Sequence, residues 1–149
     1  MNSGLELVER VRSHARRAPS QIAYLEVAGG RSISYAQLVE RIESFCDDVP
    51  ANVVILRSAN RIDFPVQFLA CLMRSKTVFP ISIELAEIEV SNLYERTSQL
   101  SADGSMLLAS SGTTGEPKIV RRDAKSLDRS HASAQSNFAN DRKMDVARA

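Results

Sequence analysis

The stretch Asn52-Val53-Val54-Ile55-Leu56 is a continuous apolar run of the kind that forms a strand covered on both faces. Two further short apolar runs, Thr77–Ile81 and Ser105–Ala109, are also predicted as strands. Segments with helical spacing of apolar residues separate the three runs. This alternation predicts an α/β fold, a partial layered domain with a mainly parallel sheet.

The helices around these strands have recognisable ends. Asn60 or Asp63 can cap the helix after the first run, and Pro65 fits only in a first turn, which favours a start near Asp63. A weaker helix is predicted from Glu84 to about Thr97, with Ser82 as its cap.

The first 50 residues carry a helix, a hairpin and a second helix. The first helix ends at Pro19, and Gln21–Val27 and Arg31–Ser34 are predicted strands, joined by the turn signal Gly29-Gly30. Ser34 and Gln37 have the spacing of a capping box, which opens the second helix.

Composition narrows the class of protein. The net charge of the 149 residues is +1, which provides no general field for nucleic acid or an acidic membrane. The longest uncharged apolar stretch, Phe64–Met73, is about half of what a spanning helix needs. The N-terminus has no basic region followed by an apolar run, so a secretory signal is not expected.

Metal and redox chemistry are not indicated either. The two cysteines, Cys46 and Cys71, are isolated, and the sequence has only two histidines. No metal-ligand spacing exists, and Cys71 is interpreted as a small core residue. We expect a reduced, cytoplasmic, metal-free protein.

The segment from Leu107 to Lys118 reads Leu-Leu-Ala-Ser-Ser-Gly-Thr-Thr-Gly-Glu-Pro-Lys and indicates a phosphate loop. Glycines three apart allow positive φ and turn backbone N–H groups inward as an anion nest. Four hydroxyl residues lie at the same point, and a lysine follows, so the chemistry favoured is triphosphate binding. The predicted nucleotide-binding residues are Ser110, Ser111, Gly112, Thr113, Thr114, Gly115 and Lys118.

Two better-known motifs do not fit this segment. Gly115 is followed by Glu-Pro-Lys rather than by the Lys-Ser/Thr of a Walker loop, and no GxSxG surrounds Ser110 or Ser111. Arg121 and Arg122, just beyond the loop, are interpreted as an exposed strand end beside it rather than as phosphate ligands.

The order of residues from Ser110 to Lys118 resembles, position by position, the phosphate loop of the AMP-forming, ATP-dependent adenylating enzymes. That family includes acyl-CoA synthetases, adenylation domains of peptide synthetases and luciferases. Weaker matches to its earlier segments occur in the family's order, and the resemblance extends over about residues 5 to 125. The weaker matches are Pro19–Ala23, Ser32–Leu38, Asn52–Leu56 with Ser58–Asn60, Phe68–Ala70 and Val78–Ile81.

The resemblance implies the N-terminal part of an adenylate-forming large domain. Its activity would be attack of a carboxylate on the α-phosphate of ATP, giving an acyl-adenylate and pyrophosphate, usually followed by transfer to a thiol. ATP with Mg²⁺ is the implied nucleotide, and the residues matching Ser111, Thr113, Thr114 and Lys118 would hold its β- and γ-phosphates. No catalytic residue is assigned.

The chain also departs from the family. The adenine, ribose and carboxylate sites follow the phosphate loop in the family, and nothing after Lys118 could replace them. The glycine usually found just before the strand Thr77–Ile81 is absent near Ser75, which predicts a strained or reshaped turn. The chain divides into residues 1–122, the partial AMP-binding domain, and residues 123–149, a marginal helix and frayed basic tail.

Three interpretations of function stay open at this point. The chain is one part of a split ligase whose partner is a separate chain carrying the rest, or a nucleotide-phosphate-binding module, or a truncated non-catalytic remnant. In each case the chain alone is expected to be incomplete for catalysis.

Overall fold

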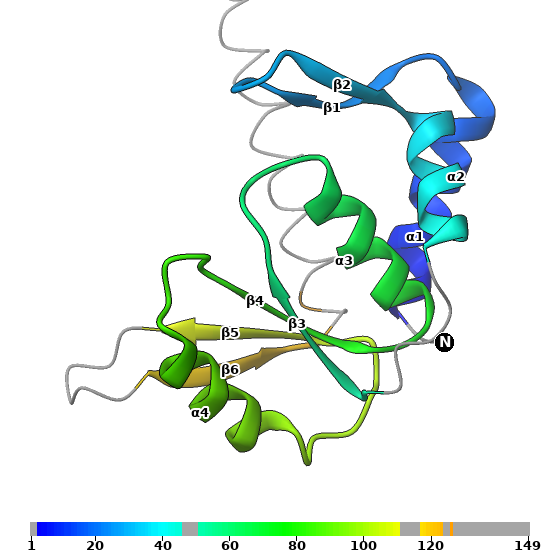
Figure 1. Cartoon of the computed structure of the whole chain (residues 1–149). Helices are drawn as coiled ribbons and strands as arrows, with labels where there is room; N and C mark the ends of the chain where they lie inside the picture. Colours follow the sequence, from blue (N-terminus) through cyan, green and yellow to red (C-terminus); the bar gives the residue numbers. More distant parts are fainter. Residues whose placement is uncertain (1–2, 46–50, 111–116, 124–125, 127–149) are drawn as a thin grey trace, which may run out of the picture.

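The computed structural model describes residues 3–45, 51–110, 117–123 and 126, and the side chains from residue 6 onward. Four helices and six strands alternate along this part of the chain (Figure 1). Their bounds are α1 Ser3–Arg17, β1 Ile22–Glu26, β2 Arg31–Ser34, α2 Tyr35–Ser44, β3 Val53–Arg57, α3 Asp63–Met73, β4 Thr77–Ile81, α4 Glu87–Thr97, β5 Met106–Ser110 and β6 Lys118–Arg122.

The main sheet has the strand order β3-β4-β5-β6. β3 runs parallel to β4 in unbroken register from Val53 opposite Thr77 to Arg57 opposite Ile81. β5 is also parallel to β4, whereas β6 returns antiparallel to β5. The prediction of an α/β fold with a mainly parallel sheet is therefore confirmed.

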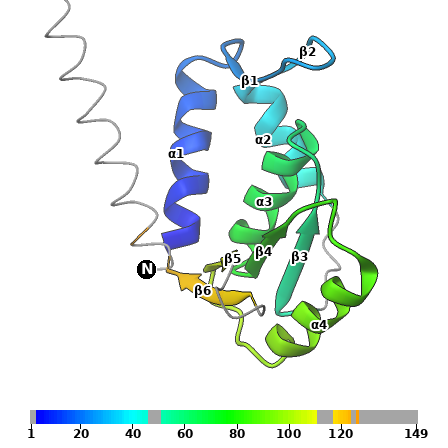
Figure 2. The ribbon, with the colours of Figure 1, turned by 90° about the vertical axis from the view of Figure 1, so that its left-hand side faces the viewer.

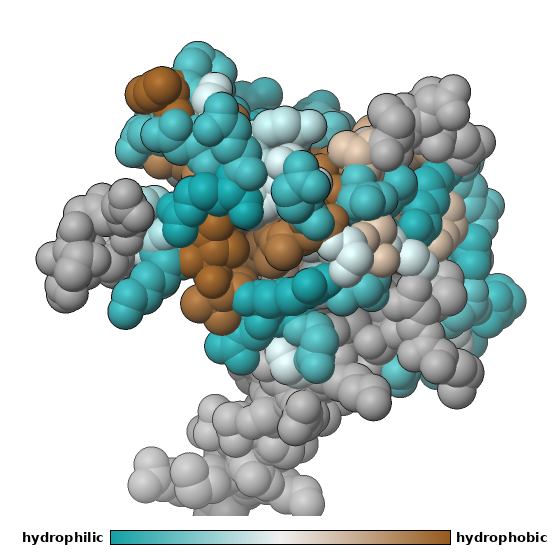
Figure 3. Space-filling view, turned by 90° about the horizontal axis from the view of Figure 1, so that it is seen from below, coloured by the Kyte–Doolittle hydropathy of each residue, from teal (hydrophilic) through white to brown (hydrophobic). Residues whose placement is uncertain are grey.

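Helices cover the two faces of this sheet, as Figures 1 and 2 show: α1, α2 and α3 lie on one side and α4 lies on the other. Val78 belongs to the core on the α3 side and Phe79, the next residue, to the core on the α4 side. β4 is thus buried on both faces, which explains its continuous apolar run. On the α4 side some apolar surface stays visible among hydrophilic residues (Figure 3), and Ile88 of α4 is exposed.

Two predicted helix starts are confirmed. The Ser34 hydroxyl accepts a hydrogen bond from the Gln37 N–H at 3.3 Å, and the Ser34 N–H donates to Gln37 Oε1 at 3.0 Å, which completes the capping box of α2. α3 begins at Asp63 and holds Pro65 in its first turn. Neither Asn60 nor Asp63 caps it, because Ile62 occupies the cap position without a side-chain hydrogen bond.

The predicted start of the next helix at Glu84 is wrong, since α4 begins at Glu87. The Ser82 hydroxyl accepts a hydrogen bond from the Glu84 N–H at 3.1 Å, which forms a local turn instead of a cap. The Arg57 guanidinium binds the carbonyls of Ile83 and Leu85, which keeps that backbone outside the helix.

The turn expected to be strained lies at the end of α3. Ser75 has a φ of +57°, the only positive φ among the described residues other than glycine. Its N–H donates to the Leu72 carbonyl, and the Lys76 N–H donates to the Cys71 carbonyl, both at 2.9 Å. This is the helix-ending motif that glycine usually completes, so the prediction for this turn is confirmed.

β1 and β2 form a separate two-stranded antiparallel hairpin, as predicted, with an irregular register between Ile22 and Tyr24. Gly30 supplies the turn with a φ of +65°. The second predicted segment, residues 123–149, lies outside the described residues apart from Asp123 and Ser126, so that division stays a prediction. No helix in the described residues is long and apolar enough to cross a membrane.

Candidate functional site

The predicted phosphate loop connects β5 to β6. Ser110 is the last residue of β5 and Lys118 the first of β6, and the two are direct partners across the strand pair. The structure therefore brings together the two ends of the predicted site. The remaining predicted residues, Ser111, Gly112, Thr113, Thr114 and Gly115, lie outside the described residues.

The ends of the loop are held by three kinds of contact. β5 and β6 pair over five residues, from Met106 opposite Arg122 to Ser110 opposite Lys118. The Ser110 hydroxyl donates to the Lys118 carbonyl at 3.4 Å, and Arg96 Nη2 of α4 donates to the Pro117 carbonyl at 3.1 Å. The loop thus starts and ends at defined positions on the sheet.

The loop leaves the sheet at its carboxyl edge. The parallel strands β3, β4 and β5 end at Arg57, Ile81 and Ser110, on the same edge of the sheet. In open α/β sheets, ligands bind outside the carboxyl ends of the strands. The predicted site therefore occupies the edge where this class of fold places its ligands.

Arg57 and Lys118, two of the cations near this edge, have different surroundings. Arg57 is engaged, since its guanidinium forms an ion pair with Glu87 and binds the Leu85 carbonyl. Lys118 is exposed, and within the described part of the chain its ammonium has no carboxylate partner. Lys118 is accordingly a cation of the described residues with freedom to contact a phosphate.

A polar cluster with two buried hydroxyls, which the sequence did not reveal, ties the other end of β6 to the sheet. The Asp103 cluster consists of Thr77, Asp103, Ser105, Arg121 and the carbonyl of Ser101. Arg121 Nη2 lies 2.5 Å from Asp103 Oδ2, and Arg121 Nε donates to the Ser105 hydroxyl at 3.0 Å. Arg121 thus pairs with Asp103 and Ser105 at an exposed position of β6, in agreement with its interpretation as part of an exposed strand end.

The hydroxyls of this cluster are fully covered. Thr77 and Ser105 are buried, and the Thr77 hydroxyl lies 3.0 Å from the Ser101 carbonyl and 3.1 Å from Asp103 Oδ1. Partial burial raises the pKa of Asp103, but hydrogen bonds from Arg121, Ser105 and Thr77 outweigh it and lower the pKa to about 2. Asp103 is therefore ionised at neutral pH.

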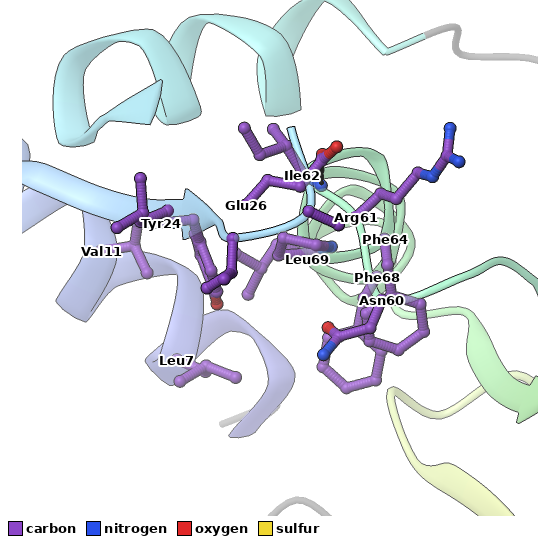
Figure 4. A pocket seen from close by; sticks show the side chains of 14 residues that line it. Leu7, Val11, Tyr24, Glu26, Asn60, Arg61, Ile62, Phe64, Phe68 and Leu69 are labelled. Atoms are coloured by element: carbon purple, nitrogen blue, oxygen red, sulfur yellow. Dashed lines mark hydrogen bonds between the residues drawn. The ribbon is translucent and has the colours of Figure 1, made fainter. Parts of the chain in front are cut away.

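A groove lies between α1, the β1–β2 hairpin and α3, with a volume of about 570 Å³. Figure 4 shows Leu7, Val11 and Tyr24 on one side of this groove and Phe64 and Phe68 on the other. We call it the hairpin groove. No pattern in the sequence indicates this groove, because its residues come from separate elements that only folding brings together.

Metal ligands are not gathered in the described part of the chain. No group of three or more His, Cys, Asp or Glu side chains lies close enough there to hold a metal ion. Cys71 is buried, and burial raises the pKa of its thiol, as expected for a core residue.

The chain has an α/β fold with a mainly parallel sheet, and a glycine- and hydroxyl-rich segment follows the carboxyl end of β5. Comparison with solved structures shows which α/β fold this is. No family model matches the sequence, and no curated protein matches it by sequence. Solved structures to which the chain is similar include N-terminal domains of adenylate-forming enzymes.

Two of these structures illustrate the likeness. The chain is similar to the N-terminal subdomain of Klebsiella oxytoca NpsA in complex with 3-hydroxyanthranilyl-AMSN, with 17% identity and a TM-score of 0.60 over 76% of this chain and 39% of that one. It is also similar to the inhibitor-bound N-terminal domain of FACL13 from Mycobacterium tuberculosis, with 19% identity and a TM-score of 0.63 over 83% and 44%. The chain therefore spans less than half of these N-terminal domains.

Proposed function

We propose that this chain is the N-terminal part of an adenylate-forming ligase, in which the segment Ser110–Lys118 binds the phosphates of ATP. The observation that carries the proposal is the place of this segment. It connects β5 and β6 at the carboxyl edge of the parallel strands, in a fold similar to the N-terminal domains of adenylate-forming enzymes.

The chemistry of the loop supports this role. Backbone N–H groups around Gly112 and Gly115, with the neighbouring hydroxyls, suit the non-bridging oxygens of a triphosphate. The exposed ammonium of Lys118 adds a positive charge, and Mg²⁺ would arrive with the nucleotide. In the complete enzyme these groups would stabilise the charge on departing pyrophosphate while a carboxylate attacks the α-phosphate.

The complete reaction needs more chain than is present. The similar N-terminal domains are more than twice as long as the part that this chain matches. We therefore expect the chain to bind MgATP weakly, with a dissociation constant of roughly 0.1–1 mM, and to require the remainder of the domain for acyl-adenylate formation.

Calorimetry with MgATP tests the phosphate site. Lys118→Ala should weaken binding about tenfold, because a charge-assisted contact contributes roughly 1.4 kcal/mol. Lys76→Ala is the matched control, since Lys76 precedes β4 at the opposite edge of the sheet, and it should change binding less than about twofold. Equal effects of the two substitutions would contradict the proposed site.

Carboxylate-dependent exchange between ATP and pyrophosphate tests completeness. Exchange by the isolated chain would overturn the view that it is incomplete. Absence of MgATP binding by the folded chain would instead favour a non-catalytic remnant that has kept the loop without its function.

A further inference from the structure

The β1–β2 hairpin has apolar side chains on both of its faces, and only one face is covered: Ile33 is buried in the core with α1 and α2, whereas the outer face is open. Val27 is 90% exposed, Leu25 61% and Ile22 57%, and Tyr24 is also exposed. Strands with apolar residues on both faces are typical of sheets that are covered on both sides. The hairpin thus has the composition of a buried element.

The backbone of the hairpin also has hydrogen-bonding groups without a partner strand among the described residues. Among the described residues β1 pairs only with β2, so each strand has one edge without a partner. A two-stranded hairpin is marginal by itself in water, and an open edge is a ready template for a further strand. The outer face and the open strand edges of this hairpin are therefore both suited to contact with additional polypeptide.

The hairpin groove continues this apolar surface toward the helices. Tyr24, Leu25 and Val27 line it together with Phe64 and Phe68. The charge of Glu26 at the groove is compensated, because Arg31 Nη2 lies 2.7 Å from Glu26 Oε2. The Ile62 N–H also donates to that oxygen, at 3.3 Å. An occupant of this surface would therefore be apolar and would not need to neutralise Glu26.

We infer that the outer face of the hairpin and the hairpin groove are the docking surface for the remainder of the adenylate-forming large domain. This inference rests on the proposed function, because it takes its occupant from the similar domains, of which this chain spans 39–44%. A segment of that remainder that adds a strand to β1 or β2 and carries apolar side chains would extend the hairpin and fill the groove.

The experiment uses the whole chain as bait in an extract of the cells that produce it. The captured polypeptide is identified by mass spectrometry, then purified and titrated against the bait. We expect a polypeptide whose sequence aligns with the part of the NpsA or FACL13 domain that this chain does not span, in a 1:1 complex. Failure to capture such a polypeptide would overturn the inference.

Variants locate the surface. Leu25→Lys with Val27→Lys should weaken the complex by at least about tenfold, since both charges would enter a desolvated interface. Ile88→Lys, an equally exposed apolar-to-lysine change on α4, should change it less than about twofold. Thermal unfolding by circular dichroism verifies that all variants fold, and equal effects of the two changes would overturn the placement.

Two further outcomes would contradict either the proposed occupant of this surface or the proposed ligase function. If sedimentation shows a dimer of the chain that Leu25→Lys with Val27→Lys converts to a monomer, a second copy covers the surface and the inference is wrong. If the complex forms through the hairpin but catalyses no carboxylate-dependent pyrophosphate exchange, the docking surface stands and the proposed ligase function fails.

Discussion

The two antiparallel strand pairs of this molecule, β1–β2 and β5–β6, are built in opposite ways. β5–β6 belongs to the four-stranded sheet, and Leu107 of β5 is 1% exposed in the core on the α4 side. β1–β2 stands apart from that sheet, and Leu25 of β1 is largely exposed. The strands that hold the predicted phosphate loop are therefore packed into the core, whereas the outer face of the N-terminal hairpin is exposed.

Each pair has one arginine–carboxylate contact, and these also differ. Arg121 and Asp103 join β6 to the loop before β5 within a cluster that includes buried hydroxyls. Arg31 and Glu26 face each other across a hairpin, and the hydrogen bond from Arg31 is the main cause that lowers the pKa of Glu26. The first contact links distant segments of the fold, whereas the second is local.

The largest expected difference between the two strand pairs is in the free energy of unfolding lost when Leu107 or Leu25 is replaced by alanine. Leu107→Ala should lower the free energy of unfolding by about 3 kcal/mol, because it removes buried methyl groups and leaves a cavity. Leu25→Ala should lower it by less than about 0.5 kcal/mol, since Leu25 is largely exposed. Urea unfolding of both variants measures the difference, and comparable losses would mean that the hairpin is already covered in solution.

Removal of one hydroxyl tests the Asp103 cluster. Thr77→Val keeps the shape of the side chain but deprives the Ser101 carbonyl and Asp103 of a buried donor, so we expect a loss of about 1–2 kcal/mol. Ser32→Ala, an exposed hydroxyl of β2, should cost less than about 0.5 kcal/mol. If the two substitutions have equal effects in urea unfolding, the cluster does not stabilise β5–β6 in the manner described.

The depressed pKa of Asp103 predicts a dependence of stability on pH. A carboxylate with a folded pKa of about 2 and an ordinary unfolded value contributes stability above pH 4 and loses it as the pH falls toward 2. Asp103 is about half exposed, so solvent screening reduces its contribution to about 1 kcal/mol. The difference in stability between wild type and Asp103→Asn should therefore shrink between pH 4 and pH 2, and a constant difference would contradict this.

Local patterns predicted local structure well. The capping box at Ser34, the helix start at Asp63 and the unusual turn at Ser75 all depend on a few neighbouring residues, and all three are confirmed. The start of α4 was missed because Arg57, 26 residues away from Ile83, binds the backbone that would have extended the helix. Contacts over such separations leave no periodic signal in the sequence.

In the candidate site, too, local features were predicted from the sequence and features that depend on tertiary contacts were not. The order of residues from Ser110 to Lys118 predicted a loop, and its two ends meet across β5 and β6. The Asp103 cluster and the hairpin groove could not be predicted, because each assembles side chains from several elements that the tertiary fold alone brings together.

The smallest expected difference concerns two turns that each hold one residue at positive φ. At the β1–β2 turn the left-handed position holds Gly30, whereas the turn before β4 and the Asp103 cluster has Ser75 in that conformation. The Ser75 carbonyl accepts a hydrogen bond from the Gly104 N–H at 3.0 Å, so this turn also supports the loop that carries Asp103. A residue with a Cβ is strained at positive φ, which glycine is not.

Exchange of residues at these turns should therefore have opposite signs. Gly30→Ala should destabilise the chain by about 1 kcal/mol from backbone strain alone, because a Cβ there meets no atom within 4 Å. Ser75→Gly should stabilise it by about 0.5 kcal/mol, since relief of strain outweighs the flexibility gained in the unfolded chain and the loss of a Ser75 contact. Thermal unfolding measures both changes. A loss of stability in Ser75→Gly would mean that the serine side chain contributes more to this turn than its strained backbone costs.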